Sequence, residues 1–152
     1  MPDDGELRRF GEGLSPKFQS VGLNDLALMA TQLGRLSEAL TLRQEDDARK
    51  ERLDEPEGTS IGLQNTCALA CDLGRLKQAL STAGGALAEA ERAASEPERK
   101  NGLVSRANAA HLRGDISAAR ADFDAATSLE NQPLLYSYRG QLQARHHLDL
   151  GD

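Results

Sequence analysis

The side chains best suited to metal or redox chemistry in this sequence are two cysteines and three histidines. Cys67 and Cys71 lie four residues apart, whereas His111 and the adjacent His146 and His147 follow much later. Zinc fingers and ribbons instead use closely spaced ligand pairs on turns. Cys67 and Cys71 fall within a helical pattern, where a free cysteine commonly packs as a small buried residue. We therefore expect reduced, structural cysteines, no metal site and no other cofactor.

No signature of a known catalytic centre occurs in the sequence. The patterns G-x-S-x-G, H-E-x-x-H and G-x-x-x-x-G-K-[ST] are all missing. Carboxylates are numerous but are predicted to lie on solvated faces, and a general acid needs a carboxyl group in a dry pocket. An enzymatic alternative would require a pocket that brings His111 against a carboxylate. The sequence thus predicts a protein that is not an enzyme.

The composition favours thin helical layers over a round core. Of the 152 residues, 39% are hydrophobic and 3% aromatic, and Trp is missing. Alanine and leucine supply most of the apolar surface, and both favour helices, whereas the rings that usually fill a globular core are scarce.

Charge and hydropathy narrow the possible partners. A formal charge of −6, from 24 acidic and 18 basic residues, disfavours nucleic acid and anionic membranes, since both need a basic face. No apolar run approaches the roughly 20 residues that span a bilayer. The amino-terminal residues lack the basic and apolar regions of a secretory signal, so we expect a cytoplasmic protein.

Three segments of the chain repeat with a period of 40 residues. Each starts with a Gly-Leu pair at 22–23, 62–63 or 102–103 and reaches a turn glycine at Gly34, Gly74 or Gly114. A fourth, shorter copy ends at Gly151. Before each turn glycine, apolar and small residues recur at helical spacing, and the pattern resumes after it. Each unit is therefore predicted to form two helices, here called helix A and helix B, joined by a left-handed glycine turn.

Small residues mark the predicted crossing of each helix pair. Ala27, Cys67 and Ala107 on the A helices are expected to face Ala39, Ala79 and Ala119 on the B helices. One hairpin cannot bury its apolar stripe alone, but stacked hairpins share a continuous core. We expect a tail over residues 1–16 and a repeat domain over 17–152, with units at about 18–57, 58–97, 98–133 and, incomplete, 134–152.

The third unit resembles the tetratricopeptide repeat. The residues that carry the resemblance are Ala107, Ala110, Gly114-Asp115-Ile116, Ala119, Phe123, Ala126 and Pro133. The usual period is 34 residues, so each unit here is about six residues longer. The resemblance implies an all-α, right-handed superhelix of about three and a half repeats. It also implies a protein or peptide partner, and the long period is similar to the sensor arrays of bacterial signalling NTPase regulators.

In such a superhelix the A helices line a concave groove that binds extended peptides or helices. Counting back from each turn glycine selects sixteen inward-facing positions, including Val21, Ile61, Cys71, Val104 and Leu148. The eight chosen as candidate partner-binding residues are Asn24, Leu28, Gln64, Asn108, His111, Tyr138, Gln141 and Arg145. The amides among them can bind a peptide backbone or can simply keep a solvated face soluble. Arg145 is the one cation among the sixteen, which disfavours a clamp for a peptide carboxylate.

Two further expectations concern the ends of the array. Residues 44–55 are highly charged and are predicted to be a solvated extension of a B helix, held by the pairs Glu45–Arg49 and Asp46–Lys50, with a docking surface as the alternative. The last A helix would leave Tyr136, Leu142 and Leu148 exposed. Self-association of two copies through that helix is therefore the alternative to partner binding.

Overall fold

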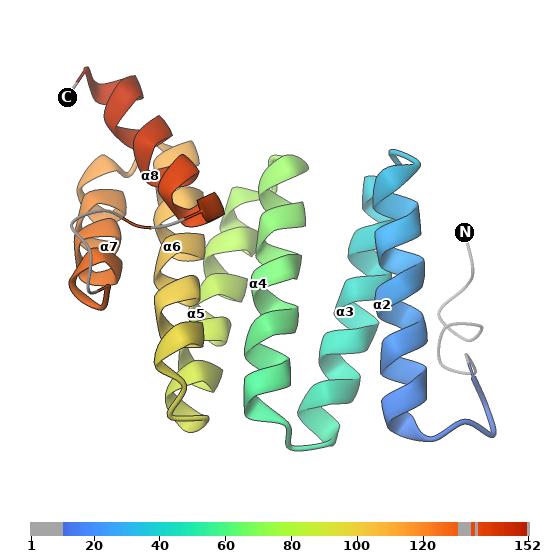
Figure 1. Ribbon diagram of the computed structural model, residues 1–152. Coiled ribbons are helices and arrows are strands. Elements are labelled where there is room, and N and C mark those ends of the chain that lie inside the picture. Colours follow the sequence, from blue (N-terminus) through green and yellow to red (C-terminus); the bar gives the residue numbers. More distant parts are fainter. Residues whose placement is uncertain (1–10, 131–134, 136, 152) are drawn as a thin grey trace.

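The computed structural model describes residues 11–130, 135 and 137–151, and this part of the chain is all-helical (Figure 1). Within these described residues, seven helices follow one another. Those of the A type are α2 (Pro16–Gln32), α4 (Pro56–Asp72), α6 (Glu96–Arg113) and α8 (Ser137–Leu150). Those of the B type are α3 (Leu36–Arg52), α5 (Leu76–Arg92) and α7 (Ile116–Ser128). The expectation of an all-α fold is confirmed.

The turns within the hairpins use the predicted glycines. Gly34, Gly74 and Gly114 have φ values of 72°, 68° and 84°, a region that side chains with a Cβ avoid. The residue after each of them donates its backbone N–H to the fifth residue back, as Arg35 does to Ala30. This bond satisfies a carbonyl at the helix end and reverses the chain tightly enough for helices A and B to pack together.

The first two turns between hairpins differ, because each has a residue other than glycine in the left-handed region. Asp54 and Ala94 have φ values of 52° and 49° and lie 40 residues apart. Each is followed within three residues by a proline, Pro56 or Pro97, in the first turn of the next A helix. A proline is favoured there, since its missing N–H would lack a helical partner in any case.

Consecutive helices pack against each other, and A helices also contact A helices, α4 with α6 and α6 with α8. In Figure 1 the A helices form the near layer, α3 and α5 lie behind them, and α8 crosses in front of α6. The crossing residues Ala27, Cys67 and Ala107 are at most 1% exposed. Their predicted burial at the contact between helices A and B is confirmed.

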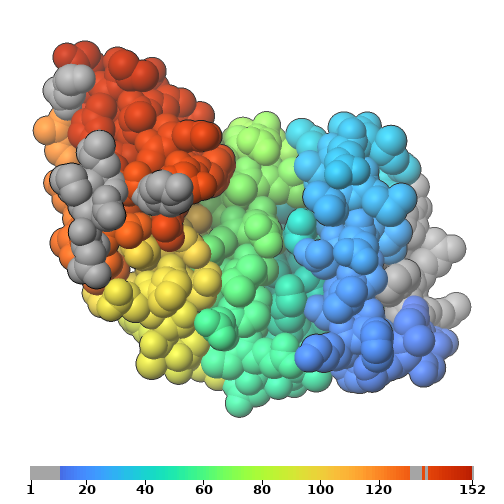
Figure 2. Space-filling model, in the orientation of Figure 1, coloured from blue at the N-terminus to red at the C-terminus, as the bar shows by residue number. Residues whose placement is uncertain are grey.

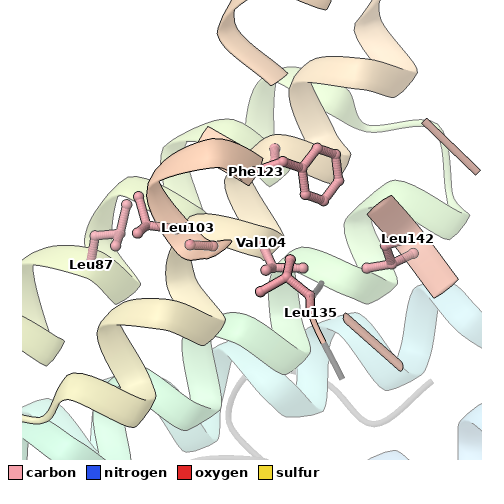
Figure 3. Close-up of a cluster of buried hydrophobic side chains, with 8 residues drawn as sticks. Leu87, Leu103, Val104, Phe123, Leu135 and Leu142 are labelled. Carbon is pink, nitrogen blue, oxygen red and sulfur yellow. The ribbon is translucent and has the colours of Figure 1, made fainter. Parts of the chain in front are cut away.

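The apolar side chains form a series of small clusters along the array. The first lies mostly between α2 and α3, the second around α4 and α5, and the third joins α5, α6, α7 and α8. Figure 3 shows the third, in which Leu87, Leu103, Val104 and Leu135 approach one another, with Phe123 and Leu142 beside them. Each cluster depends on its neighbours in the stack, as in a quasi-one-dimensional repeat protein.

Helix α5 contains two adjacent glycines, Gly84 and Gly85. The helix runs through both without interruption from Leu76 to Arg92. A Cβ at Gly85 would lie 3.4 Å from Leu63 Cδ1, whereas nothing lies within 4 Å of a Cβ at Gly84. A Cβ at position 85 would thus be in ordinary contact with Leu63 of α4, and nothing in the structure requires a glycine at either position.

Candidate partner-binding face

The eight candidate residues lie on the four A helices. Asn24 and Leu28 belong to α2, Gln64 to α4, Asn108 and His111 to α6, and the other three to α8. We call the layer surface that they share the A face. It is the near side of the molecule in Figure 2, where α2, α4 and α8 supply most of the visible surface. All eight residues thus lie in one layer, but some are hydrogen-bonded within the protein and others are exposed.

The amides at the amino-terminal end are engaged inside the protein. Asn24 accepts a hydrogen bond from the Arg43 guanidinium. Gln64 donates from Nε2 to Glu98 Oε2 at 2.8 Å and to Ser60 Oγ at 3.2 Å. The contact between Gln64 and Glu98 joins α4 to α6. These amides therefore hold neighbouring helices together, and a partner would have to displace those bonds to use them.

At the carboxy-terminal end, α8 covers the A face of α6. Val104 and Asn108 are only 2% and 8% exposed, and Asn108 accepts a hydrogen bond from Arg145. Arg139 donates to Asn101 Oδ1 at 2.8 Å and pairs with Glu130 at 3.1 Å. The third row of the expected groove is thus closed by the last helix, because α8 lies across α6.

Large apolar side chains remain exposed on the A face where α8 does not cover it. Val21, Leu28 and Ile61 are 51%, 48% and 43% exposed, respectively. We call these three residues the apolar strip. Val21 and Ile61 are equivalent positions of successive repeats. Tyr138, at the start of α8, is also exposed as a whole. Partial desolvation of its hydroxyl, followed by the charge of Asp72, raises the pKa of that group.

The two cysteines are free and buried. Cys67 Sγ lies 3.7 Å from the carbonyl oxygen of Ser105 and donates to it across the contact between α4 and α6. The hydrogen bond between the thiols raises the pKa of Cys67 and lowers that of Cys71. No group of three or more metal-ligating side chains occurs among the described residues. Cys71, predicted to line the groove, therefore contributes little accessible surface.

His111 is held between two residues of α8. Its Nε2 lies 2.9 Å from Asp149 Oδ2, and its Nδ1 lies 3.0 Å from His146 Nδ1. The structure thus brings His111 against a carboxylate, as the enzymatic alternative requires. The contact lies at the packing surface of α6 and α8, and Asp149 is largely exposed. This arrangement fixes α8 in place.

A buried polar cluster lies at the junction of the first two repeats, and the sequence did not predict it. Asp46, Asp47 and Arg49 are 0%, 6% and 6% exposed, so the prediction of a solvated extension is wrong for this part of α3. The predicted pairs Glu45–Arg49 and Asp46–Lys50 do form, at 3.1 and 2.7 Å.

The cluster is buried because neighbouring helices supply polar partners. Ser20 of α2 donates to Asp46, and Thr66 of α4 donates to Asp47 at 2.6 Å. The repeat alignment could have predicted this burial. Asp46 is equivalent to Ala86 and Asp47 to Leu87 in the next repeat, and both of those residues are buried.

The residues proposed for self-association differ in their exposure. Leu142 is 9% exposed and belongs to the third apolar cluster, so its predicted exposure is wrong. It faces α6 rather than solvent. Leu148 is 76% exposed, as predicted. Tyr136 lies outside the described residues.

A hollow of about 600 Å³ lies beside Leu148 on α8. Its lining includes Leu135, Gly140, Ala144 and His147. Ala144 is exposed, whereas Ala107, the equivalent residue of α6, is fully buried beneath α7. The surface that helix B covers in the third repeat is thus open on α8.

None of the described helices is both long and apolar enough to cross a membrane. Comparison of the sequence with protein-family models and with curated proteins finds no match.

Proposed function

We propose that this chain is a non-catalytic interaction scaffold of the tetratricopeptide type. It binds a peptide or helix of a partner protein on the A face, and it serves as the sensor or adaptor part of a bacterial regulatory protein. The observation that carries the proposal is the exposure of the large apolar side chains of the apolar strip, Val21, Leu28 and Ile61, on the A helices. Exposed apolar surface on one layer of a repeat array is typical of docking sites.

The engagement of the amides refines the expected mode of binding. Asn24, Gln64 and Asn108 already have partners within the chain. Recognition would therefore come from burial of partner side chains against the apolar strip and Tyr138. A partner segment with apolar residues at helical spacing meets this requirement, as in other complexes of a helix with a groove. Burying one large apolar side chain contributes roughly 1.5–3 kcal/mol.

The experiment is a selection of peptides from a displayed library on the full chain, followed by affinity measurement. Ile61→Asp should weaken the selected peptides at least about tenfold, since a charge would enter the contact. Leu33→Asp is the matched control, because Leu33 is an exposed leucine at the end of α2. Equal affinity for both variants would show that the peptides bind elsewhere, and a library without binders would count against the proposal itself.

Self-association through α8 is a second candidate function. It is favoured by Leu148 and the adjacent open hollow around Gly140 and Ala144. Sedimentation over a wide concentration range tests it. Two copies should associate reversibly, and Leu148→Glu should abolish the association. A concentration-independent monomer would exclude this function.

A further inference from the structure

A chain of hydrogen bonds connects the end of α6 with the last two turns of α8. Asp149 Oδ2 lies 2.9 Å from His111 Nε2, and the two Nδ1 atoms of His111 and His146 lie 3.0 Å apart. The two imidazole rings meet edge to face at a centroid distance of 5.0 Å. The three side chains therefore form a relay from the protein surface to the buried side of α8.

The bond between the two Nδ1 atoms limits the charge of the pair. A hydrogen bond needs one donor and one acceptor, and a neutral imidazole has one nitrogen of each kind. When both rings are protonated, both Nδ1 atoms carry a hydrogen and neither can accept. The bond between His111 and His146 is therefore compatible with at most one imidazolium.

Burial prevents water from replacing the lost bond. His146 is 0% exposed and packs its ring against Phe123 of α7 at a centroid distance of 5.2 Å. The side chain of His111 is 9% exposed. Two cations in contact at such a site would repel each other with little solvent screening. Separation of α8 from α6 relieves that repulsion and hydrates both rings.

Charged and titratable groups from several helices surround the two rings. Asp149 of α8 lies 2.9 Å from His111 Nε2, and His147 lies against His146, with ring centroids 5.7 Å apart. The contact from α7 is the uncharged Phe123. At the same end, Arg113 of α6 pairs with Asp115. Besides desolvation by burial, the charges of Asp72 and Cys71 of α4 raise the pKa of Tyr138 on α8.

We propose that His111 and His146 form a pH-sensitive latch, which holds α8 on α6 at neutral pH and releases it when both imidazoles are protonated. An ordinary imidazole titrates near pH 6.5. The released state binds one proton more than the latched state, so the ratio of released to latched α8 rises up to about tenfold for each pH unit below that value. Other contacts that hold α8 involve no histidine, for example the ion pair Arg139–Glu130 and the bond from Gln143 to Thr127.

Release would change the A face. Tyr138, Gln141 and Arg145 move with α8, and Val104 and Asn108 beneath it become accessible. Resting on the proposed function, this predicts that acidification remodels the carboxy-terminal part of the docking surface. The latch itself does not depend on a partner and is tested without one.

The experiment is amide hydrogen exchange of the full chain at pH 7.5 and pH 5.5, corrected for intrinsic exchange rates. In the wild type, protection of α8 should fall by up to about tenfold, since the change spans one pH unit below 6.5, while α4 and α5 keep theirs. His147→Gln is the matched control and should behave like the wild type. His146→Gln should make α8 protection independent of pH, because Gln can still bond to His111 and does not titrate in this range.

Constant protection of α8 in the wild type would overturn the latch, as would an equal fall in His146→Gln. A parallel fall in α4 and α5 would indicate general acid unfolding and would also overturn it. If His146→Gln fails to dock α8 at either pH, imidazole ¹⁵N resonances of the wild type at pH 7.5 decide. The latch requires one protonated Nδ1 and one hydrogen-bonded, unprotonated Nδ1. Two unprotonated Nδ1 atoms would exclude it.

Discussion

A carboxylate oxygen of Asp47 lies so close to Gly62 that any Cβ at position 62 would overlap it. The same contact recurs one repeat later, where Leu87 packs on Gly102 and a Cβ would lie 3.0 Å from Leu87 Cδ2. The repeat therefore uses glycine to let helix B of one unit approach helix A of the next. The first junction of the array is polar at this point, whereas the second is apolar.

Gly62→Ala should destabilise the protein. The added methyl group would displace the Asp47 carboxylate from its bond with Thr66, and overpacking of this kind costs about 1–3 kcal/mol. Gly84→Ala is the control, since no atom lies within 4 Å of a Cβ there. Alanine inside a helix is favoured over glycine by roughly 1 kcal/mol, so this variant should gain stability. Urea denaturation of both variants measures these two opposite changes in the free energy of unfolding.

Asp47 should make stability depend on pH. Burial raises its pKa from 3.8 to about 6, and the bond from Thr66 and the charge of Lys50 only partly offset this effect. Because the folded pKa is the higher one, the stability associated with this group is complete below pH 3.8 and is lost as the pH rises through about 6. The ionised group then costs about 3 kcal/mol.

Asp47→Asn should therefore raise the free energy of unfolding at pH 7 by up to about 3 kcal/mol and leave it nearly unchanged at pH 3.5. Asp46→Asn is the matched control and should lower stability by about 1–3 kcal/mol at pH 7, because Asp46 pairs with Lys50 at 2.7 Å. A loss of stability in both variants would show that the ionised Asp47 carboxylate does not destabilise the fold.

Phe123→Ala should cost about 3–5 kcal/mol, as is usual for removal of a buried aromatic ring. Phe123 is 2% exposed, lies in the third apolar cluster and contacts His146. Phe18→Ala makes the same chemical change at a side chain that is 69% exposed. Its effect should remain within about 0.5 kcal/mol. Thermal unfolding distinguishes the two, and similar shifts would contradict the packing of α7 against α8.

Asn108→Ala should destabilise the docking of α8 by about 1–2 kcal/mol, because it removes the acceptor of Arg145 at a buried site. Gln141→Ala, on the exposed side of α8, should change stability by less than about 0.5 kcal/mol. Protection of α8 against hydrogen exchange reports on both. Equal effects would mean that the amide of Asn108 does not position α8.

The sequence by itself determined the helices and their turns. The glycines at 34, 74 and 114 and the 40-residue period are local or periodic signals, and left-handed turns and helical spacing follow from them without knowledge of the fold. For the same reason the buried crossing residues Ala27, Cys67 and Ala107 could be predicted. The pairs Glu45–Arg49 and Asp46–Lys50 also follow from spacing along one helix.

Only the tertiary structure decided which polar residues are buried and which predicted groove residues are free. From the sequence, Asp47 is indistinguishable from a surface carboxylate, but in the fold Thr66 and Gly62 of α4 contact it. Asn108 likewise has the pattern of an accessible groove residue, but Arg145 of α8 donates a hydrogen bond to it. Burial of such groups is favourable only when a partner distant in sequence supplies the hydrogen bond. The spacing of residues along one helix contains no information on that partner, because the partner is selected by the way the helices stack.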